Sequence, residues 1–169
     1  AGFGRTGKLW GFEHYGVVPD IVLLGKALGG GMPLGAFISS QTNMAALTNN
    51  PVLGHITTFG GHPVCCAAGM AATNALLDEE LVNGVAEKEQ LFHSLLTHPA
   101  IKAVRSKGLL MAIELASSEH VSETLQRCLQ NGLFSDWFLF APQCIRIAPP
   151  LTITHDEIRT ACAILQDCL

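Results

Sequence analysis

The residues Pro19–Gly31, PDIVLLGKALGGG, constrain the possible folds more than any other stretch of the chain. The first part, DIVLL at Asp20–Leu24, is rich in branched apolar residues and does not alternate with polar ones. That pattern is typical of a strand buried on both faces, as in a parallel sheet. The glycines at 29–31 can continue neither a helix nor a strand. The sequence therefore predicts a buried strand that ends in a turn-rich loop.

One charged side chain, Lys26, stands at the end of this strand. Its neighbours on both sides are apolar or glycine, so we expect a partly desolvated amine, which favours the neutral, nucleophilic form. Such an amine can form a Schiff base, and glycines let a flat ligand approach the backbone closely. A solvated surface lysine is the competing interpretation. A phosphate-binding P-loop is excluded, because Asp20 replaces the first glycine of that motif and Ala27 its Ser or Thr.

The composition restricts the classes of protein to which the chain can belong. Hydrophobic residues make up 49% and charged residues 14%, which argues against disorder and indicates a surface partly covered by something else. The formal net charge is −4 and no basic stripe is present, so we expect no nucleic-acid partner. The apolar runs are too short to cross a membrane. The six cysteines follow neither a metal nor a disulfide pattern, and most lie in apolar runs, which indicates buried, reduced thiols in a cytoplasmic protein.

The rest of the chain is predicted to alternate between helices and short strands. The expected elements are a strand at 36–40, a short helix at 43–49, helices at 62–77 and 79–97, two strands around Gly108 within 101–115, a helix at 118–132, two strands within 137–154, and a helix at 154–169 with Thr154 as its N-cap. The first part fits an α/β arrangement and the last part a small α+β unit. We place the domain boundary within Leu77–Pro99.

Two further motifs are candidates for binding. Thr57 and Thr58 lie in a glycine-containing loop that enters the next helix, where hydroxyl and N–H groups suit a phosphate. Such pairs are more often structural. Arg146 alternates with isoleucines in a predicted strand, where its planar fork can bind a carboxylate or can simply be exposed. His55 and His62 lie near two cysteines, but their spacing is no known ligand pattern and we expect no metal.

Three separated stretches together resemble one protein family. They are GFGRTGKLWGFEHYGVVPDIVLLGKALGGGMPLGA at 2–36, GHITTFGGHPVCCAAG at 54–69 and CIRIAPPLTITHDEI at 144–158. In this order they resemble the class III (subgroup II) pyridoxal-phosphate-dependent aminotransferases, most of all the acetylornithine and ornithine aminotransferases. The resemblance implies an α/β fold, the PLP-dependent transferase fold type I. It implies that residues 1–77 are the C-terminal part of the large parallel-sheet, cofactor-binding domain, 78–98 a connecting helix, and 99–169 the small α+β C-terminal domain.

The resemblance also implies a cofactor, pyridoxal 5'-phosphate, and roles for four residues. Lys26 resembles the lysine that forms the internal aldimine, a Schiff base with the cofactor. Thr57 and Thr58 resemble the hydroxyl pair that reaches the cofactor phosphate in the neighbouring subunit's site, which implies a homodimer. Arg146 resembles the arginine that binds the substrate α-carboxylate.

The implied reaction moves an amino group from an ornithine-like or other ω-amine donor to 2-oxoglutarate. An aminomutase or a decarboxylase on the same fold is an alternative, as is a non-catalytic fragment. The family has an acidic motif, Asp-Glu-x-Gln, immediately before GFGRTG, whose aspartate pairs with the pyridine nitrogen of the cofactor. The sequence begins at Ala1, after that position, and His62 stands where the family usually has Asn.

We therefore expect an isolated polypeptide of residues 1–169 neither to fold stably nor to catalyse transamination. The reason is that the strands of the large domain would keep solvent-exposed apolar faces and edges with unpaired backbone N–H and C=O groups. Calorimetry and size-exclusion chromatography check this expectation. A soluble monomer that melts cooperatively would contradict it.

Overall fold

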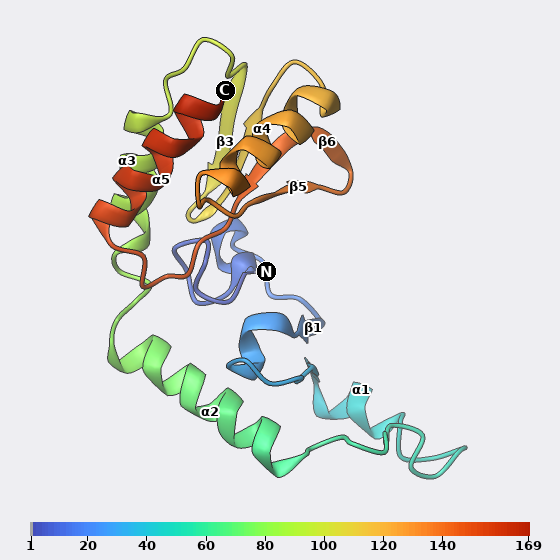
Figure 1. Ribbon diagram of the computed structural model, residues 1–169. Helices are drawn as coiled ribbons and strands as arrows, with labels where there is room; N and C mark the ends of the chain where they lie inside the picture. The colour runs from blue at the N-terminus through green and yellow to red at the C-terminus, as the bar shows by residue number, and fades with distance from the viewer. Residues whose placement is uncertain (1) are drawn as a thin grey trace. The chain divides into compact units, whose positions relative to one another are not determined.

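The structure, a computed structural model, describes residues 2–169 and divides into two compact units. Unit 1 consists of residues 2–3 and 8–80, and unit 2 of residues 4–7 and 81–169. Figure 1 follows the helices and strands of each unit along the chain. Among the helices of the described residues, none is both long and apolar enough to cross a membrane.

Unit 1 is built from a two-stranded sheet, two 3₁₀ turns and two helices over its described residues. These elements are η1 (Gly11–Tyr15), β1 (Ile21–Leu24), η2 (Lys26–Gly29), β2 (Ala36–Ser39), α1 (Gln41–Ala45) and α2 (Pro63–Asp78). Helix α2 has Pro63 in its first turn, where a missing N–H leaves no hydrogen bond unmade. The strands expected at 20–24 and 36–40 and the helix expected at 62–77 are confirmed to within one or two residues.

The surroundings of β1 differ from the prediction of a strand buried on both faces of a parallel sheet. β1 pairs antiparallel with β2, in a register that places Ile21 opposite Ser39. Ile21 and Leu23 are 53% and 80% exposed. The connection between the strands, residues 25–35, is too short for the crossover of about a dozen or more residues that a parallel pair needs. In these residues β1 is therefore neither buried nor part of a parallel pair.

Unit 2 is an α+β arrangement with a four-stranded antiparallel sheet in the order β3-β4-β6-β5. Its elements are α3 (Val85–Leu95), β3 (Ala103–Lys107), β4 (Leu110–Glu114), α4 (Ser118–Gln130), β5 (Asp136–Phe138), β6 (Ala141–Ile147) and α5 (His155–Cys168). The side chain of Thr154 accepts a hydrogen bond from the Glu157 N–H at the start of α5, which confirms the predicted cap. Both strand pairs and the last two helices are also as predicted.

Helix α3 is shorter than the helix predicted at 79–97. It begins at Val85, directly after Gly84, and ends at Leu95. The residues before it form turns, and Glu80 has a φ of +50°, which no right-handed helix contains. Glycine is a poor helix former, so the apolar spacing that suggested an earlier start does not extend the helix across Gly84.

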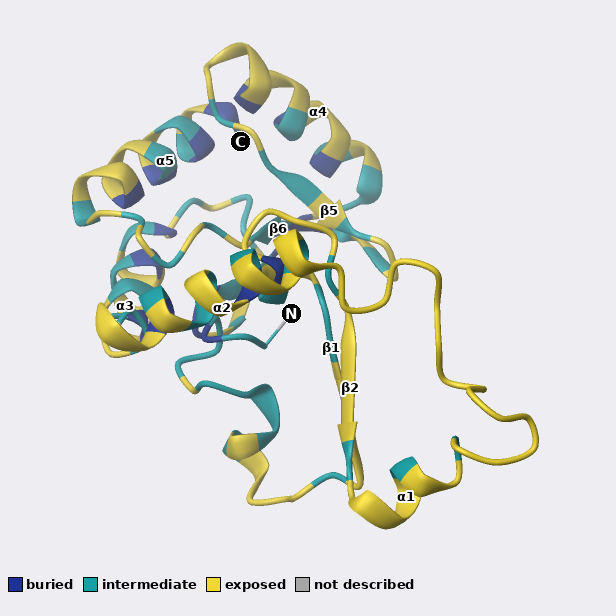
Figure 2. Ribbon diagram, turned by 90° about the horizontal axis from the view of Figure 1, so that it is seen from below, coloured by how far each residue is buried: buried dark blue, intermediate teal, exposed yellow. Residues whose placement is uncertain are grey.

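The apolar core of unit 2 lies between the sheet and its helices. Leu109, Met111, Ile113 and Leu115, on and beside β4, have no exposed surface. The helices contribute the buried side chains Val85, Phe92, Val121, Ile158, Cys162 and Leu165. In Figure 2 the dark-blue residues of α4 and α5 lie along one side of each helix, whereas β2 and α1 of unit 1 are almost entirely exposed.

The cysteines divide by unit. Cys128, Cys144, Cys162 and Cys168 are buried and free of disulfide bonds in unit 2, as the sequence predicted. Burial raises the pKa of Cys162 to about 11, and burial together with Cys168 raises the pKa of Cys128 to about 12. Both therefore remain unreactive thiols at neutral pH. Cys66 in unit 1 is exposed, so the prediction of burial is wrong for this residue.

The turn between β3 and β4 provides a test of the packing. Gly108 has a φ of +59°, and a Cβ there would lie 2.5 Å from the Arg5 carbonyl oxygen. Gly108→Ala should lower the free energy of unfolding by about 2–4 kcal/mol, because backbone strain and a clash with backbone atoms add up. Gly132→Ala is the matched control, with a φ of +84° and nothing within 4 Å, and should cost only about 1 kcal/mol. Urea denaturation measures both, and equal losses would contradict the clash.

Candidate active site

Lys26 combines a position after a strand with an unusual backbone conformation. It is the first residue of η2, and its φ is +52°, in the left-handed region that costs a residue with a Cβ about 1 kcal/mol. The other described non-glycine residues with positive φ are Asn50, Leu53 and Glu80, and none of these follows a strand. Because such backbone outliers concentrate at functional sites, this conformation singles out Lys26 independently of any motif.

The side chain of Lys26 is exposed. It makes no hydrogen bond or ion pair with any other residue in 2–169. The prediction of a partly desolvated amine is therefore wrong for the described chain. Within residues 2–169, the neighbouring glycines at 25 and 29–31 contribute no side chain that covers it.

The loop that carries Lys26 lies directly against α2. A Cβ on Gly30 would come within 2.6 Å of the Ala68 carbonyl oxygen and 2.8 Å of the Ala72 Cβ. A Cβ on Gly69 would come within 2.8 Å of the Leu28 carbonyl oxygen. Because Gly30 and Gly69 have no side chain, the loop and α2 can approach each other closely at these two points. Helix α2 therefore supports the loop through backbone contacts.

Two other glycines of the loop leave space instead of filling it. A Cβ on Gly31 would meet nothing within 4 Å, and a Cβ on Gly25 would reach only the Leu34 carbonyl oxygen at 4.0 Å. The residues beside Lys26 thus leave room for a flat group, and the accessible primary amine suits an aldehyde. These residues fit the pyridoxal phosphate that the sequence implies.

Thr57 and Thr58 lie in the exposed loop between α1 and α2. The Gly60 N–H donates to the Thr57 carbonyl oxygen at 3.2 Å, and the His62 N–H donates to the Phe59 carbonyl oxygen at 3.2 Å, which folds the loop into consecutive turns. The loop then enters α2, whose N-cap residue His62 makes no side-chain cap hydrogen bond. Helix N–H groups without a capping acceptor, close in sequence to two hydroxyls, suit a phosphate. In the described chain no hydrogen bond joins either threonine to Lys26.

Arg146 lies on β6, directly opposite Asp136 on β5. Its Nε donates to Asp136 Oδ1 at 2.7 Å, and its Nη2 donates to Asp136 Oδ2, so the two side chains form a fork-to-fork ion pair. The Phe138 ring lies 5.9 Å from the guanidinium carbon. Hydrogen bonding to Asp136, with the attraction of its charge, raises the pKa of Arg146. The two side chains remain 40% and 38% exposed, so solvent and ligands can reach the pair.

Arg5 is a residue near this pair that the sequence interpretation missed. Its Nη1 donates to the Pro149 carbonyl oxygen at 2.6 Å and to the Leu109 carbonyl oxygen at 3.3 Å. Burial, and to a smaller extent the positive charge of Arg146, lowers the pKa of Arg5. The sequence marks Arg5 only by its place in the glycine-containing GFGRTG stretch, which gives no indication of these distant contacts. Arg5 fixes the segment 4–7 to the strands of unit 2.

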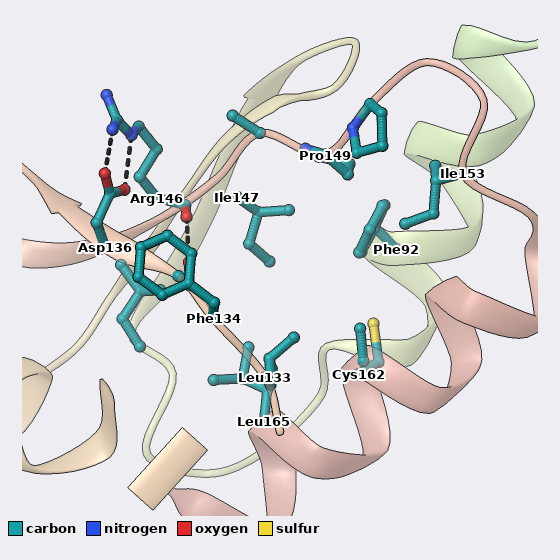
Figure 3. Close-up of a pocket in the computed structure, with 15 residues that line it drawn as sticks. Phe92, Leu133, Phe134, Asp136, Arg146, Ile147, Pro149, Ile153, Cys162 and Leu165 are labelled. Carbon is teal, nitrogen blue, oxygen red and sulfur yellow. Dashed lines mark hydrogen bonds and ion pairs between the residues drawn. The ribbon is translucent and has the colours of Figure 1, made fainter. Parts of the chain in front are cut away.

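A pocket of about 390 Å³ in unit 2 has Arg146 and Asp136 at its edge. Figure 3 shows the two side chains facing each other beside Phe134, while Ile147, Phe92 and other apolar side chains surround the interior. The polar side chains that line it are Ser135, Asp136 and Arg146. The pocket can therefore accept an aliphatic group, with one ion pair at its rim.

Lys26, Thr57 and Thr58 belong to unit 1, and Arg146 belongs to unit 2. Among residues 2–169 no three His, Cys, Asp or Glu side chains are grouped so that they could hold a metal ion. The chemistry that the described groups offer is that of an amine, two hydroxyls and a guanidinium.

Solved structures of known proteins have a fold similar to that of this chain. Solved structures include the ornithine aminotransferase of Toxoplasma gondii, which has partial occupancy of PLP at its active site. It matches with a TM-score of 0.87 and 33% identity over 99% of this chain and 40% of that one. The acetylornithine aminotransferase of Elizabethkingia anophelis matches with a TM-score of 0.84 and 34% identity over 99% and 43% of the two chains. The fold is that of the PLP-dependent aminotransferases.

The sequence matches the family described as aminotransferase class-III over residues 1–169, and the chain belongs to this family. An acetylornithine aminotransferase of Caldanaerobacter subterraneus is 39% identical over 99% of this chain. A putrescine aminotransferase of Pectobacterium atrosepticum is 42% identical over 92% of it. The chain spans 42% and 35% of the lengths of these two relatives. The family, fold type and family cofactor predicted from the sequence are thereby confirmed.

The backbone conformation of Lys26 can be tested without measuring activity. Lys26→Gly and Lys26→Ala both remove the amine, but only glycine adopts a φ of +52° without strain. We expect the glycine variant to exceed the alanine variant in free energy of unfolding by about 1 kcal/mol. Chemical denaturation of both variants in the absence of cofactor measures the difference. Equal stabilities would show that the position carries no backbone strain.

Proposed function

We propose that the protein is a pyridoxal-phosphate-dependent aminotransferase that moves an amino group from an ornithine-like or other ω-amine donor to 2-oxoglutarate. The observation that carries this proposal is Lys26, an exposed amine held in a strained conformation on a loop that lies against α2. Membership of the class-III aminotransferases supports it. The named relatives act on acetylornithine and putrescine, and both names imply an amine donor.

In this proposal Lys26 is the residue that would hold the cofactor, through its Nζ amine. The bound cofactor supplies an electron sink for the carbon next to the substrate nitrogen. The Lys26 amine would be the group that takes up and returns the proton at that carbon. Its exposure and the open space beside Gly31 suit both roles.

The hydroxyls of Thr57 and Thr58, with the N–H groups at the start of α2, would bind the cofactor phosphate of a second subunit. The absence of any hydrogen bond between these threonines and Lys26 in the described chain is compatible with the two groups serving different sites. This assignment makes the protein a homodimer with sites shared across the interface. We place it in the cytoplasm, with residues 1–77 in the large cofactor-binding domain, 78–98 as the connecting segment that contains α3, and 99–169 as the small domain.

Arg146 would bind a substrate carboxylate, such as that of 2-oxoglutarate. Its guanidinium is half-exposed, remains charged at any physiological pH, and presents N–H groups in the planar arrangement that a carboxylate matches. The apolar lining of the neighbouring pocket would accept the methylene groups of such a substrate.

Replacing Lys26 tests the proposed function. The purified protein with cofactor should show the visible absorbance of a covalently bound pyridoxal group, and Lys26→Ala should abolish it, because no other amine can replace Nζ. Transamination should fall by roughly 10²- to 10⁴-fold or more. Lys102→Ala removes an exposed lysine of unit 2 and serves as the control with unchanged absorbance.

An unchanged spectrum in the Lys26 variant would refute the assignment of the cofactor to this residue. Rates with acetylornithine, ornithine, succinylornithine, 4-aminobutyrate and putrescine then identify the donor. A protein that transaminates none of these amines with 2-oxoglutarate would refute the proposed reaction.

A further inference from the structure

We propose that Phe138 is a positioning residue, whose ring orients the Arg146 guanidinium so that it can bind a substrate carboxylate. This inference rests on the proposed function, in which Arg146 is the carboxylate contact. Its basis is a contact within unit 2, where the guanidinium carbon lies over the Phe138 ring, 5.9 Å from the ring centroid. That distance is within the range of a cation–π interaction.

The pairing of β5 with β6 brings this ring to the arginine. Phe138 is two residues beyond Asp136, which lies directly opposite Arg146, so Phe138 is on the diagonal from the arginine. Diagonal neighbours in an antiparallel pair are within reach of aromatic and long side chains. The pairing becomes irregular between Trp137 and Phe138. Irregularities of this kind change the direction of a side chain, and here the redirected ring meets the guanidinium.

The other aromatic side chains of this hairpin do not take part in the contact. Trp137 and Phe140 are 54% and 96% exposed, and in the described chain neither ring lies under a guanidinium. Phe138 is only partly exposed. The contact with Arg146 thus distinguishes Phe138 from two neighbours of the same kind.

The ring restrains a motion that the ion pair leaves open. The bonds from Nε and Nη2 to Asp136 hold the guanidinium along one edge, as Figure 3 shows. A planar group held along one edge can still tilt about that edge. A ring against its flat face restrains the tilt and occupies none of the N–H groups. Together the two contacts fix the direction of Nη1, which has no hydrogen-bond partner in the described chain.

An arginine that is already oriented binds a carboxylate with a smaller loss of conformational entropy. The Arg146 side chain is 40% exposed, so without the ring the guanidinium would sample several tilts about the edge held by Asp136. A substrate would then have to order the guanidinium on binding, which lowers affinity. Phe138 should therefore affect the affinity for carboxylates and not the chemistry at the cofactor.

Binding of glutarate, a dicarboxylate that cannot accept an amino group, tests the inference by calorimetry on the cofactor-loaded protein. Phe138→Leu keeps an apolar side chain but removes the ring. It should weaken glutarate binding by roughly twofold to fivefold, the size expected of a cation–π contact at a partly exposed site. Phe138→Met should weaken it similarly, and Phe138→Tyr, which retains the ring, should bind glutarate as the unmodified protein does.

Phe140→Leu is the matched control, because it removes an exposed ring from the same hairpin and should leave the affinity unchanged. An equal loss of affinity in the control, or in the tyrosine variant, would show that the ring face of Phe138 is not responsible.

A double-mutant cycle determines whether Phe138 acts through Arg146. In an Arg146→Ala background, Phe138→Leu should have no further effect on glutarate binding, and an undiminished effect would overturn the inference. If Arg146→Ala alone leaves binding unchanged, Arg146 is not the carboxylate contact, and its proposed role and this inference both fail. If Arg146→Ala weakens binding but neither Phe138→Leu nor Phe138→Met does, only the inference on Phe138 fails.

Steady-state kinetics separate a positioning role from a general disturbance of unit 2. Phe138→Leu should raise the KM for 2-oxoglutarate by the same twofold to fivefold and leave kcat unchanged, as expected when binding is weakened and the chemical step is not. A fall in kcat with an unchanged KM would contradict the positioning role.

Discussion

Strand β6 determines where the Arg146–Asp136 ion pair lies, because it is hydrogen-bonded to a neighbour on each side. β4 places Ala112 opposite Arg146, and β5 places Asp136 opposite the same residue from the other side. A shift of the register by one residue would turn the guanidinium to the other face of the sheet. The register is in turn fixed by Met111 and Ile113 of β4, which are fully buried. Buried apolar side chains of β4 thus set the position of the fork-shaped ion pair described at the pocket.

The elements of unit 2 were predictable from the sequence because their signals are local. A glycine at Gly108 between two apolar alternating stretches predicts the hairpin of β3 and β4, and Thr154 followed by Glu157 predicts the start of α5. The fold type followed from the family resemblance and not from the periodicity. The antiparallel partner and the exposure of β1 were not predictable, since they depend on which other chain segments lie beside it and not on its own residues.

For the candidate site, too, the sequence predicted some features and not others. The residue types Lys26, Thr57, Thr58 and Arg146 were identified from motifs, but their surroundings were not. The φ of Lys26 and the Asp136 partner of Arg146 are properties of the folded backbone and of strand register. Arg5 makes contacts to residues more than a hundred positions away, and no pattern within one sequence predicts contacts at that separation.

The contact between Gly30 and the Ala68 carbonyl oxygen has a consequence for how this region can evolve. The atom that α2 offers to the loop is a backbone atom, which every amino acid possesses. Substitutions at position 68 can therefore accumulate without moving the oxygen, provided that the helix persists. Position 30 has no such freedom, because any side chain there meets that oxygen. Sequence drift should consequently be uneven at this contact, with more variation at position 68 of the helix than at position 30 of the loop.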